Sequence, residues 1–361
     1  MRDGNMDIII AGGGITGCYT GQLLKRKGFN PVVFEEHPEV GKPVQCAGLI
    51  GRETVDTSKI PFPEEVVMRQ IDGARFFLKN EWFEIERTKA AYVIDRAKLD
   101  TYFSRGLDVH TKEKVVEYEE DDMVTVTTDK SVYTCNVLFG CDGPFSVVRK
   151  KGAFSLKTQF YPGAQYIIAV APEDDFIELH MKPPFFFWLI PETEETTRIG
   201  FVGPHAVHEL DRFIQRKEIT GEILDKQAGV IALGYGSIAA KRIALVGDAA
   251  CQVKPLTGGG IFYGMKAAEI AVENLDDLLQ YEKEWKEKYG REIKVGLKLR
   301  KIYEGLSEKN LTRVFNMFKE NTDIIEDIAD FERHSSIVRE FLKHPILFKL
   351  AGSALREFLT Q

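Results

Sequence analysis

Residues 7–17 read DIIIAGGGITG, a short apolar run followed by Gly12, Gly14 and Gly17 at G-x-G-x-x-G spacing. The run predicts a buried strand, Asp7–Ala11, and the apolar-periodic segment after the glycines predicts a helix. In a dinucleotide-binding unit the first glycine allows a tight turn, the second lets the pyrophosphate approach, and the third lets the helix pack on the strand. The stretch therefore favours an α/β fold with a nucleotide at its first turn.

A carboxylate follows at the distance that such a unit requires. Residues 30–34 predict a second strand, and Glu35 ends it about 20 residues after the glycines, where an acidic residue binds the adenosine ribose hydroxyls. Glu36 beside it and Thr16 in the first turn are further candidate contacts. A glycine-rich turn without a ligand is the alternative, and glycines, strands and carboxylate together favour the dinucleotide site.

A second glycine-rich stretch, residues 247–260, reads GDAACQVKPLTGGG. It follows an apolar run that predicts a buried strand, so its acidic residue emerges at the strand's carboxyl end and could accept ribose or ribityl hydroxyls. Proline stiffens the next turn, and three glycines allow a flat ring to approach the N-terminus of a helix, where amides are unpaired. An ordinary strand-to-helix turn is the alternative. The candidate contacts are Gly247, Asp248, Pro255, Gly258, Gly259, Gly260 and Ile261.

Composition excludes some classes of function. A chain of 361 residues, 44% hydrophobic and 29% charged with a net charge of −7, is ordinary for a globular protein and argues against nucleic acid as a partner. Its five cysteines are scattered without a CxxC pair, which indicates a reducing compartment. His205 and His208 have metal-like spacing but no third ligand, so we interpret them as surface or capping residues and expect no metal site. We expect a cytoplasmic protein, with a peripheral membrane contact left open.

The middle of the chain predicts mostly strands. Residues 73–79 and 82–86 predict a hairpin, and residues 91–94 predict a strand that returns toward the N-terminal nucleotide-binding unit. Asp95 is a plausible N-cap for the helix that follows, and Arg96 could reach a phosphate or ribose. From these residues alone, a surface salt bridge is the favoured alternative for Arg96.

Two loops, one after residue 141 and one over residues 41–51, carry further candidate site residues. The segments 115–118, 123–128 and 131–136 predict an antiparallel set, and 137–141 predicts a buried strand that leads into Asp142 and Gly143, a second carboxylate at the same sheet edge or a simple turn signal. Residues 41–51, GKPVQCAGLIG, are too apolar for a solvated linker, so something flat could lie on them. Cys46 is the only nucleophile there, although an isolated cysteine is more often inert.

Residues 152–240 are rich in aromatic side chains and predict a separate sheet. Residues 183–191 read PPFFFWLIP, and strand alternation sends Phe186, Trp188 and Ile190 to one face and the three residues between and before them to the other. One face could line a cavity for an apolar ligand, and core packing alone explains the pattern equally well. Residues 278–361 predict charged helices, whose last amphipathic segment, 341–358, could pack on this domain or touch a membrane.

These elements define the expected fold class, α/β, with a Rossmann-like domain, an antiparallel β-sheet domain and a C-terminal helical segment. We expect the nucleotide-binding domain to comprise residues 1–50, 92–150 and 241–277. Residues 51–91 and 151–240 would form the substrate-binding β domain, and residues 278–361 the helical region.

The order of three motifs resembles flavoproteins similar to p-hydroxybenzoate hydroxylase: the first glycines with Glu35, then Cys141-Asp142-Gly143, then Gly247-Asp248. The resemblance implies one FAD stretched between the first glycine turn and the second. It places Arg96 near the cofactor and Asp248 on the ribityl or pyrophosphate portion, and it matches Asp142 and Gly143 to the second fingerprint of that superfamily.

Within that superfamily the sequences PVQCAGLI, PLTGGGI and PPFFFWLIP resemble geranylgeranyl reductases, particularly the archaeal enzymes that saturate membrane lipid chains. The family's aromatic motif, YxWxFP, is occupied here by Phe186, Trp188, Ile190 and Pro191, which departs from the pattern at two positions. The resemblance implies that these four residues bind substrate and that Cys46 and Ala47 lie beside the flavin. Cys46 is the candidate catalytic residue, as a proton donor, and the alternative is that it only shapes the pocket.

The resulting hypothesis is an FAD-dependent reductase that adds two hydrogens across double bonds of a polyprenyl lipid. No second dinucleotide fingerprint is apparent, so electrons would come from transient NADPH docking or from a redox protein such as ferredoxin. An FAD monooxygenase acting on an aromatic or isoprenoid substrate, and a flavin-containing lipid-binding protein without catalysis, are the rival hypotheses.

Overall fold

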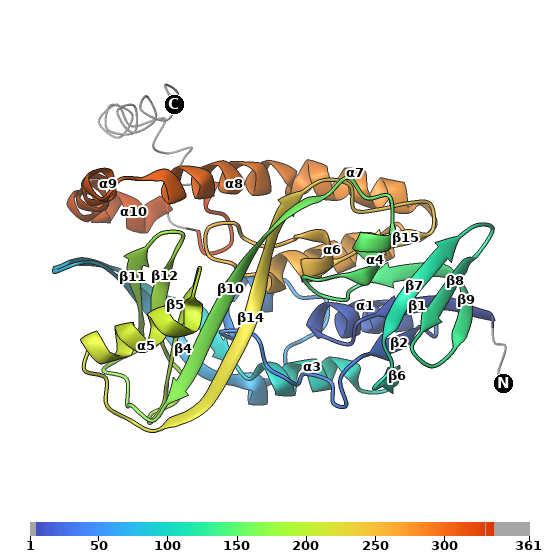
Figure 1. Ribbon diagram of the computed structural model, residues 1–361, viewed down its shortest axis with the longest axis horizontal. Helices are drawn as coiled ribbons and strands as arrows, with labels where there is room; N and C mark the ends of the chain where they lie inside the picture. The colour runs from blue at the N-terminus through green and yellow to red at the C-terminus, as the bar shows by residue number, and fades with distance from the viewer. Residues whose placement is uncertain (1–4, 329, 336–361) are drawn as a thin grey trace.

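Two β-sheets organise the chain, and helices cover them (Figure 1). The computed structural model describes residues 5–328 and 330–335. The predicted α/β class is confirmed, because parallel strands alternate with helices in the first sheet and a second, mostly antiparallel sheet lies beside it. The amphipathic segment predicted for residues 341–358 lies outside the described residues.

The first sheet has seven strands in the order β6-β2-β1-β9-β8-β7, with β15 also paired to β9. Its strands are β1 (Asn5–Ala11), β2 (Val32–Glu35), β6 (Asp108–Thr111), β7 (Val115–Glu120), β8 (Val124–Thr128), β9 (Val132–Gly140) and β15 (Ile243–Leu245). The prediction of separate strands over 131–136 and 137–141 was wrong, because β9 is continuous. Its first half pairs antiparallel with β8, and its second half pairs parallel with β15.

The carboxyl ends of four parallel strands meet at one edge of this sheet. Ala11 of β1 is in register with both Phe34 of β2 and Gly140 of β9, and Leu245 of β15 is in register with Gly140. The residues that follow these strands, 12–17, 35, 141–143 and 247–248, are therefore brought together, as ligand sites in such sheets require.

Helices α1 (Ile15–Arg26), α3 (Arg96–Ser104), α4 (Val147–Lys151), α6 (Ile261–Glu273) and α7 (Leu278–Lys288) accompany this sheet. Helices α1 and α6 pack together, and their interface carries a buried hydrogen bond of 2.8 Å from the Tyr19 hydroxyl to Glu269. Asp95 caps α3 by accepting from the Lys98 amide at 3.0 Å, as its position predicts. The main hydrophobic core is built from the strands and from α1 and α6.

The second sheet has eight strands in the order β14-β10-β13-β12-β11-β4-β5-β3. These are β3 (Leu49–Gly51), β4 (Val67–Leu78), β5 (Glu81–Ile94), β10 (Lys157–Ile168), β11 (Phe176–Lys182), β12 (Phe185–Pro191), β13 (Thr197–Val202) and β14 (Ile223–Tyr235). All neighbours are antiparallel except β11 and β4. The predicted hairpin is confirmed, but β5 runs unbroken to Ile94, and the end of the 41–51 loop forms strand β3 against it.

Helix α5 (Ala206–Arg216) covers one face of the second sheet, where Phe213 stacks on Phe187 with ring centroids 4.2 Å apart. His205 occupies its N-cap position in a left-handed conformation, and His208 is exposed. Short helices α2 (Arg52–Asp56) and η1 (Glu64–Val66) lie between β3 and β4.

The C-terminal helices α8 (Gly290–Gly305), α9 (Glu308–Glu320) and α10 (Thr322–Ile328) form the upper edge in Figure 1. Helix α9 packs on the second sheet through Phe315, whose ring lies 5.2 Å from that of Phe83. Over the residues that the structure describes, none of the helices has both the length and the apolar character needed to cross a bilayer.

Candidate functional site

The first glycine turn leaves room for a ligand at one position and is tightly packed at two others. A Cβ on Gly12, which has φ +100°, would lie 2.4 Å from the carbonyl oxygen of Cys141, and a Cβ on Gly17 would lie 1.9 Å from the carbonyl oxygen of Gly12. A Cβ on Gly14, by contrast, would meet no atom within 4 Å. The open position is the one that the sequence assigns to the pyrophosphate, at the N-terminus of α1.

Glu35 is held in place at the end of β2. Its Oε2 accepts from the Gly13 amide at 2.8 Å, and its Oε1 accepts from the His37 amide at 2.8 Å. Oε1 also lies 2.7 Å from the His37 ring Nδ1, so the oxygen with a further lone pair is Oε2, which can still accept from a ribose hydroxyl. Glu36 points elsewhere and forms an exposed ion pair with Lys114.

Asp142 presents an unpaired acceptor at the same edge. Its Oδ2 accepts from the amides of Val147 and Val148 at 2.6 and 3.1 Å, while its buried Oδ1 has no hydrogen-bond partner among the described residues. Burial raises the pKa of Asp142, and the Ser146 hydroxyl, followed by these amides, opposes the shift. Gly143 follows at φ +73°, and a Cβ there would meet no atom within 4 Å. A buried acceptor without a donor is a place where a ligand donor fits.

The start of the second glycine stretch touches the first turn. Gly247 has φ +72°, and a Cβ there would lie 2.8 Å from Thr16 Oγ1. Burial raises the pKa of Asp248, and the nearby guanidinium groups of Arg96 and Arg149 oppose that shift. Arg149, which is itself buried, donates to the Ala249 carbonyl at 2.7 Å and so fixes the 3-10 turn η2 (Gly247–Ala250).

The turn from Pro255 to Gly260 is supported by helix α8. Arg300 donates to the carbonyls of Pro255, at 2.9 Å, and Leu256, and its guanidinium lies 3.5 Å from the centre of the Phe185 ring. A Cβ on Gly258 would lie 2.3 Å from Ile231 Cδ1, and one on Gly259 would lie 2.6 Å from Lys254 Cε.

Gly260 closes this turn against Asp248 and opens the next helix. A Cβ on Gly260 would lie 2.8 Å from Asp248 Oδ1, and Gly260 is the N-cap residue of α6, where no side chain caps the helix. Ile261 is the first residue of that helix. The amides at its N-terminus are thus available to stabilise a negatively charged ligand edge.

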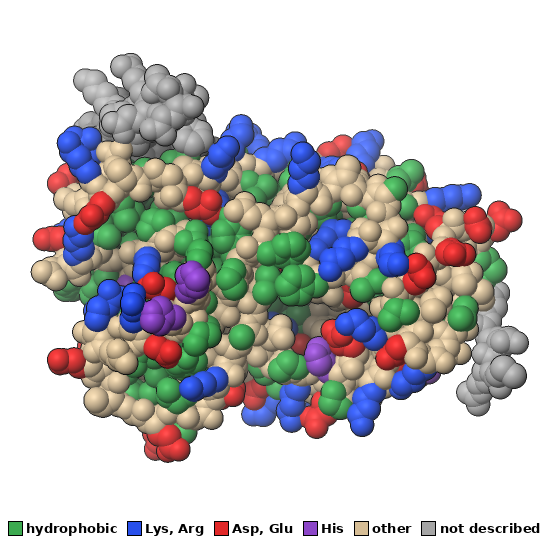
Figure 2. Space-filling view, viewed as in Figure 1, with side chains coloured by type: hydrophobic (Ala, Val, Ile, Leu, Met, Phe, Trp, Pro, Cys, Tyr) green, Lys and Arg blue, Asp and Glu red, His purple; other side chains and the backbone are tan. Residues whose placement is uncertain are grey.

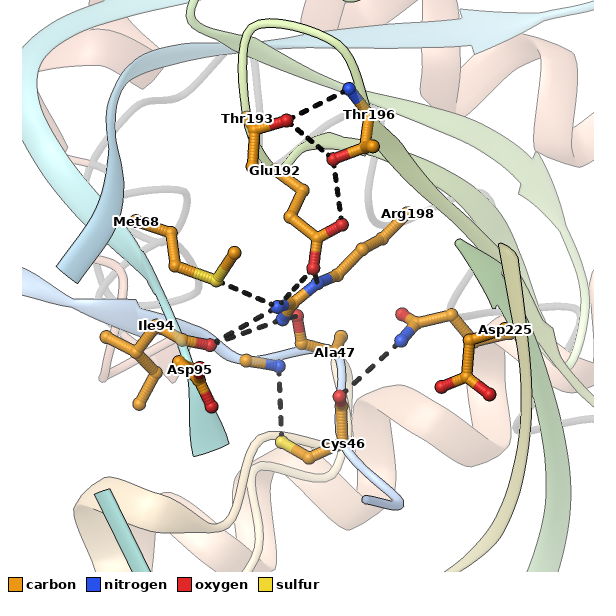
Figure 3. Close-up of polar contacts among 12 residues, drawn as sticks. Cys46, Ala47, Met68, Ile94, Asp95, Glu192, Thr193, Thr196, Arg198 and Asp225 are labelled. Carbon is orange, nitrogen blue, oxygen red and sulfur yellow. Dashed lines mark hydrogen bonds and ion pairs between the residues drawn. The ribbon is translucent and has the colours of Figure 1, made fainter. Parts of the chain in front are cut away.

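Cys46 lies in a turn whose backbone carbonyls are contacted by side chains of the second sheet (Figure 3). It is the one cysteine that is not buried, and its sulfur accepts from the Gly48 amide at 3.3 Å. Arg198 donates to the Ala47 carbonyl at 2.6 Å, and Gln165 approaches the Cys46 carbonyl at 3.5 Å.

Arg96 forms an ion pair with Asp100, with N–O distances of 3.2 Å and side-chain exposures of 14% and 6%, so the favoured alternative of a surface salt bridge was wrong. Burial alone would lower the pKa of Arg96, but the Asp100 carboxylate and the adjacent Cys46 raise it well above its ordinary value. Arg96 therefore stays charged between the Cys46 turn and Asp248.

The aromatic strand β12 mostly alternates as predicted. Phe187 packs under α5, while Phe186 and Trp188 pack on the opposite side. The indole N–H of Trp188 donates to Gln165 Oε1 at 2.9 Å, and Gly200 makes room for the indole, since a Cβ there would lie 2.2 Å from its Cζ2. Phe185 departs from the alternation: it joins the Phe186 cluster because Arg300 stacks on its ring and the Tyr303 hydroxyl binds its carbonyl.

The aromatic strand, the Cys46 turn and the second glycine turn border one region. Trp188 is connected through Gln165 to the Cys46 carbonyl, and it packs in one cluster with Ile231, which touches Gly258. Ile190 lies at the other end of the strand in the cluster beneath Ala47, and Pro191 is buried at its end. An apolar strand, the turn that carries the thiol and the second glycine turn are therefore linked through Gln165 and Ile231.

The surface is hollowed near the centre of the face in Figure 2. A separate groove of about 590 Å³ lies between residues 38–42 and helix α3. It does not include Gly14, Asp248 or the second glycine turn, so it is not the place for a flavin ring.

Several residues of the site were missed from the sequence. Arg149, Gln165, Arg198, Lys254, Arg300 and Glu332 all hold site loops. A charged residue inside an otherwise apolar strand could have indicated such a role, as for Arg198 in the strand TRIGFV. For Arg300 and Glu332 the contacts span tens of residues or more between helix and loop, and no local pattern marks them.

We expect acid to destabilise the protein partly through His334. Burial, then the charges of Lys254 and Arg300, lower the pKa of His334 to about 3, below its usual value. A depressed folded-state pKa means that its stabilising contribution is present above the unfolded pKa and is lost as pH falls from about 6.5 toward 3. Stability should therefore fall by up to about 1.4 kcal/mol between pH 7.5 and 5.5.

Urea unfolding at these two pH values measures this effect. The variant His334→Leu should flatten the dependence, while His208→Leu, at an exposed position, should leave it unchanged. An identical pH slope in the wild type and in His334→Leu would contradict the assignment.

Comparisons with known proteins agree with this geometry. Residues 10–56 match an NAD(P)-binding Rossmann-like domain. An uncharacterized protein of Methanocaldococcus jannaschii is 30% identical, with 95% of this chain and 96% of that protein covered. A digeranylgeranylglycerophospholipid reductase of Methanothermobacter thermautotrophicus is 27% identical over 84% of this chain and 89% of its own length.

A solved structure shares the fold over nearly the whole chain. A geranylgeranyl bacteriochlorophyll reductase-like protein of Thermoplasma acidophilum superimposes with a TM-score of 0.83 at 20% identity, covering 97% of this chain and 99% of that one. The glycine turns, the open position at Gly14 and the unpaired Asp142 acceptor fit an FAD stretched across the first sheet. The chain therefore belongs to the geranylgeranyl reductase family of FAD-dependent oxidoreductases.

Proposed function

We propose that this protein saturates carbon–carbon double bonds in the geranylgeranyl or related polyprenyl chains of membrane lipid precursors. The observation that carries the proposal is the shared region between the Trp188 strand, the Cys46 turn and the second glycine turn. It combines an apolar wall with flavin-site elements, and the names of the Methanothermobacter relative and the Thermoplasma neighbour support a prenyl substrate.

The chain's own residues supply position and a dry environment. When bound and reduced, FAD supplies a hydride to one alkene carbon, and a proton must reach the other. An isolated alkene has no carbonyl to polarise, so much of the rate must come from holding the bond close to the flavin. Phe186 and Trp188 provide apolar contact for that purpose, and Cys46, as the partly exposed cysteine, is the thiol that can hold a proton near a bound chain.

The electron donor and the membrane contact belong to the same proposal. We propose transient docking of NADPH, or a redox protein such as ferredoxin, as the donor, because the sequence has no second dinucleotide fingerprint and Glu35 would bind the FAD ribose. A polyprenyl lipid is the substrate partner, reached by peripheral contact of a cytoplasmic protein with the membrane surface.

Incubation of dithionite-reduced enzyme with a geranylgeranyl lipid under strictly anaerobic conditions tests the proposal. Mass spectrometry should show products heavier by two hydrogens per reduced bond, and the corresponding fully saturated lipid serves as the control. Hydroxylated products that form only with oxygen would instead identify a monooxygenase. Lipid binding without any product from a reducible flavin would identify a lipid-binding protein.

A further inference from the structure

Arg198 of strand β13 holds the Cys46 turn from the side of the second sheet. Its Nη1 donates to the Ala47 carbonyl at 2.6 Å and approaches the Ile94 carbonyl at 3.4 Å, and only 5% of the residue is exposed. Figure 3 shows the guanidinium at the centre of the group, between Glu192, Met68, Ile94 and Ala47. The charged side chain of Arg198 therefore donates to the backbone carbonyl next to the partly exposed Cys46.

Glu192 neutralises this buried cation. Its Oε1 accepts from Arg198 Nε at 2.9 Å and lies 2.7 Å from Nη2, and its Oε2 accepts from the Thr196 hydroxyl at 2.9 Å. Glu192 directly follows Pro191 at the end of the aromatic strand. The pair therefore ties the Cys46 turn to strand β12 and to the tight turn at Thr193.

Gly48 adapts the turn to this arginine. Gly48 has φ +68°, and a Cβ there would lie 2.1 Å from Arg198 Nη1 and 2.6 Å from the Ile94 carbonyl oxygen. Any larger residue would be strained at this φ and would displace the guanidinium. Side chains of the second sheet contact the two carbonyls before Gly48: Gln165 approaches that of Cys46, and Arg198 donates to that of Ala47.

We infer that Arg198 is a positioning residue, which sets the orientation of the Cys46 thiol without touching the flavin or the substrate. The inference rests on the proposed function for its catalytic consequence, because Cys46 matters to turnover only if it lies beside the reacting bond. Its structural half, the restraint on the thiol, is independent of any substrate.

Alkylation of Cys46 by iodoacetamide tests the structural half in the holoenzyme. The other four cysteines are buried, so the rate at the Cys46 peptide can be followed by mass spectrometry. The double variant Arg198→Gln/Glu192→Gln removes both charges together, which avoids leaving one buried charge unpaired. Loss of this charge-assisted bond should raise the alkylation rate about tenfold, and Arg198→Lys should recover part of the restraint.

Arg75→Met is the matched control, because Arg75 forms ion pairs with Asp174 and Glu84 in the same sheet without touching the Cys46 turn. Its alkylation rate should equal that of the wild type. Gly48→Ala should raise the rate by itself and add little in the Arg198→Gln/Glu192→Gln background, since both changes remove the same contact. Unchanged alkylation in folded Arg198→Lys and in the double variant would overturn the inference.

Turnover separates this inference from the proposed function. With a geranylgeranyl lipid, kcat of the double variant should fall about tenfold while KM and FAD content stay near wild type. Faster alkylation without any wild-type turnover of the lipid would uphold the positioning role and count against the substrate. A fall in kcat with unchanged alkylation would overturn the positioning role.

Discussion

Gly14→Ala is expected to abolish most FAD binding while leaving the free energy of unfolding of the apoprotein almost unchanged. A Cβ at this position meets no protein atom within 4 Å, and Gly14 has φ −73°, which alanine adopts without strain. The added methyl group would occupy the space that the pyrophosphate needs. Affinity should fall roughly 10- to 100-fold, the effect expected for overpacking a close contact.

Gly17→Ala is the contrasting variant, because its Cβ would lie 1.9 Å from the Gly12 carbonyl oxygen. It should lower the free energy of unfolding by about 3 kcal/mol even in the apoprotein. Gly305→Ala, where nothing lies within 4 Å and no ligand is expected, should change neither quantity. Flavin fluorescence titration and urea unfolding measure both effects, and normal FAD affinity in Gly14→Ala would remove the pyrophosphate from this turn.

Lys254→Met is expected to destabilise the protein by about 3–5 kcal/mol, because it leaves a buried carboxylate unpaired. Lys254 Nζ lies 2.9 Å from Glu332 Oε2, with side-chain exposures of 7% and 1%. The other oxygen of Glu332 accepts from the Thr54 hydroxyl at 2.8 Å, and the Tyr263 hydroxyl donates to the Glu332 carbonyl at 2.8 Å. This pair therefore joins the second glycine turn to helices α2 and α6.

Thermal and urea unfolding of three variants check this expectation. Lys254→Met/Glu332→Leu removes both charges and should recover most of the lost stability. Lys59→Met, which removes an exposed pair with Glu273, should cost less than about 1 kcal/mol. A loss in Lys254→Met no larger than that in Lys59→Met would show that the buried pair contributes little.

The local chemistry of the first sheet could be predicted from the sequence. Glycine spacing, strand length and the carboxylate of Glu35 obey short-range rules, and the structure places Glu35 within 2.8 Å of the Gly13 amide. The same holds for the cap at Asp95 and for the hairpin of β4 and β5. These features depend on residues that are close together in the chain, so the local sequence pattern predicts them.

The supports of the site could not be predicted, because they depend on contacts between distant segments. Arg198 reaches Ala47 across 151 positions, and Lys254 reaches Glu332 across 78. The burial of Arg96 likewise follows from packing, which is why a surface ion pair was the wrong expectation. The continuity of strand β9 could not be predicted either, because its pairing changes from antiparallel to parallel along its length and a sequence pattern does not show which strands pair.

Anaerobic stopped-flow absorbance of the dithionite-reduced holoenzyme, mixed with a geranylgeranyl lipid, tests the central claim most directly. We expect the oxidised flavin spectrum to return on mixing, with one flavin oxidised per double bond saturated, and the fully saturated lipid to produce no change. A flavin that stays reduced with the unsaturated lipid and is reoxidised only when oxygen is admitted would contradict this claim.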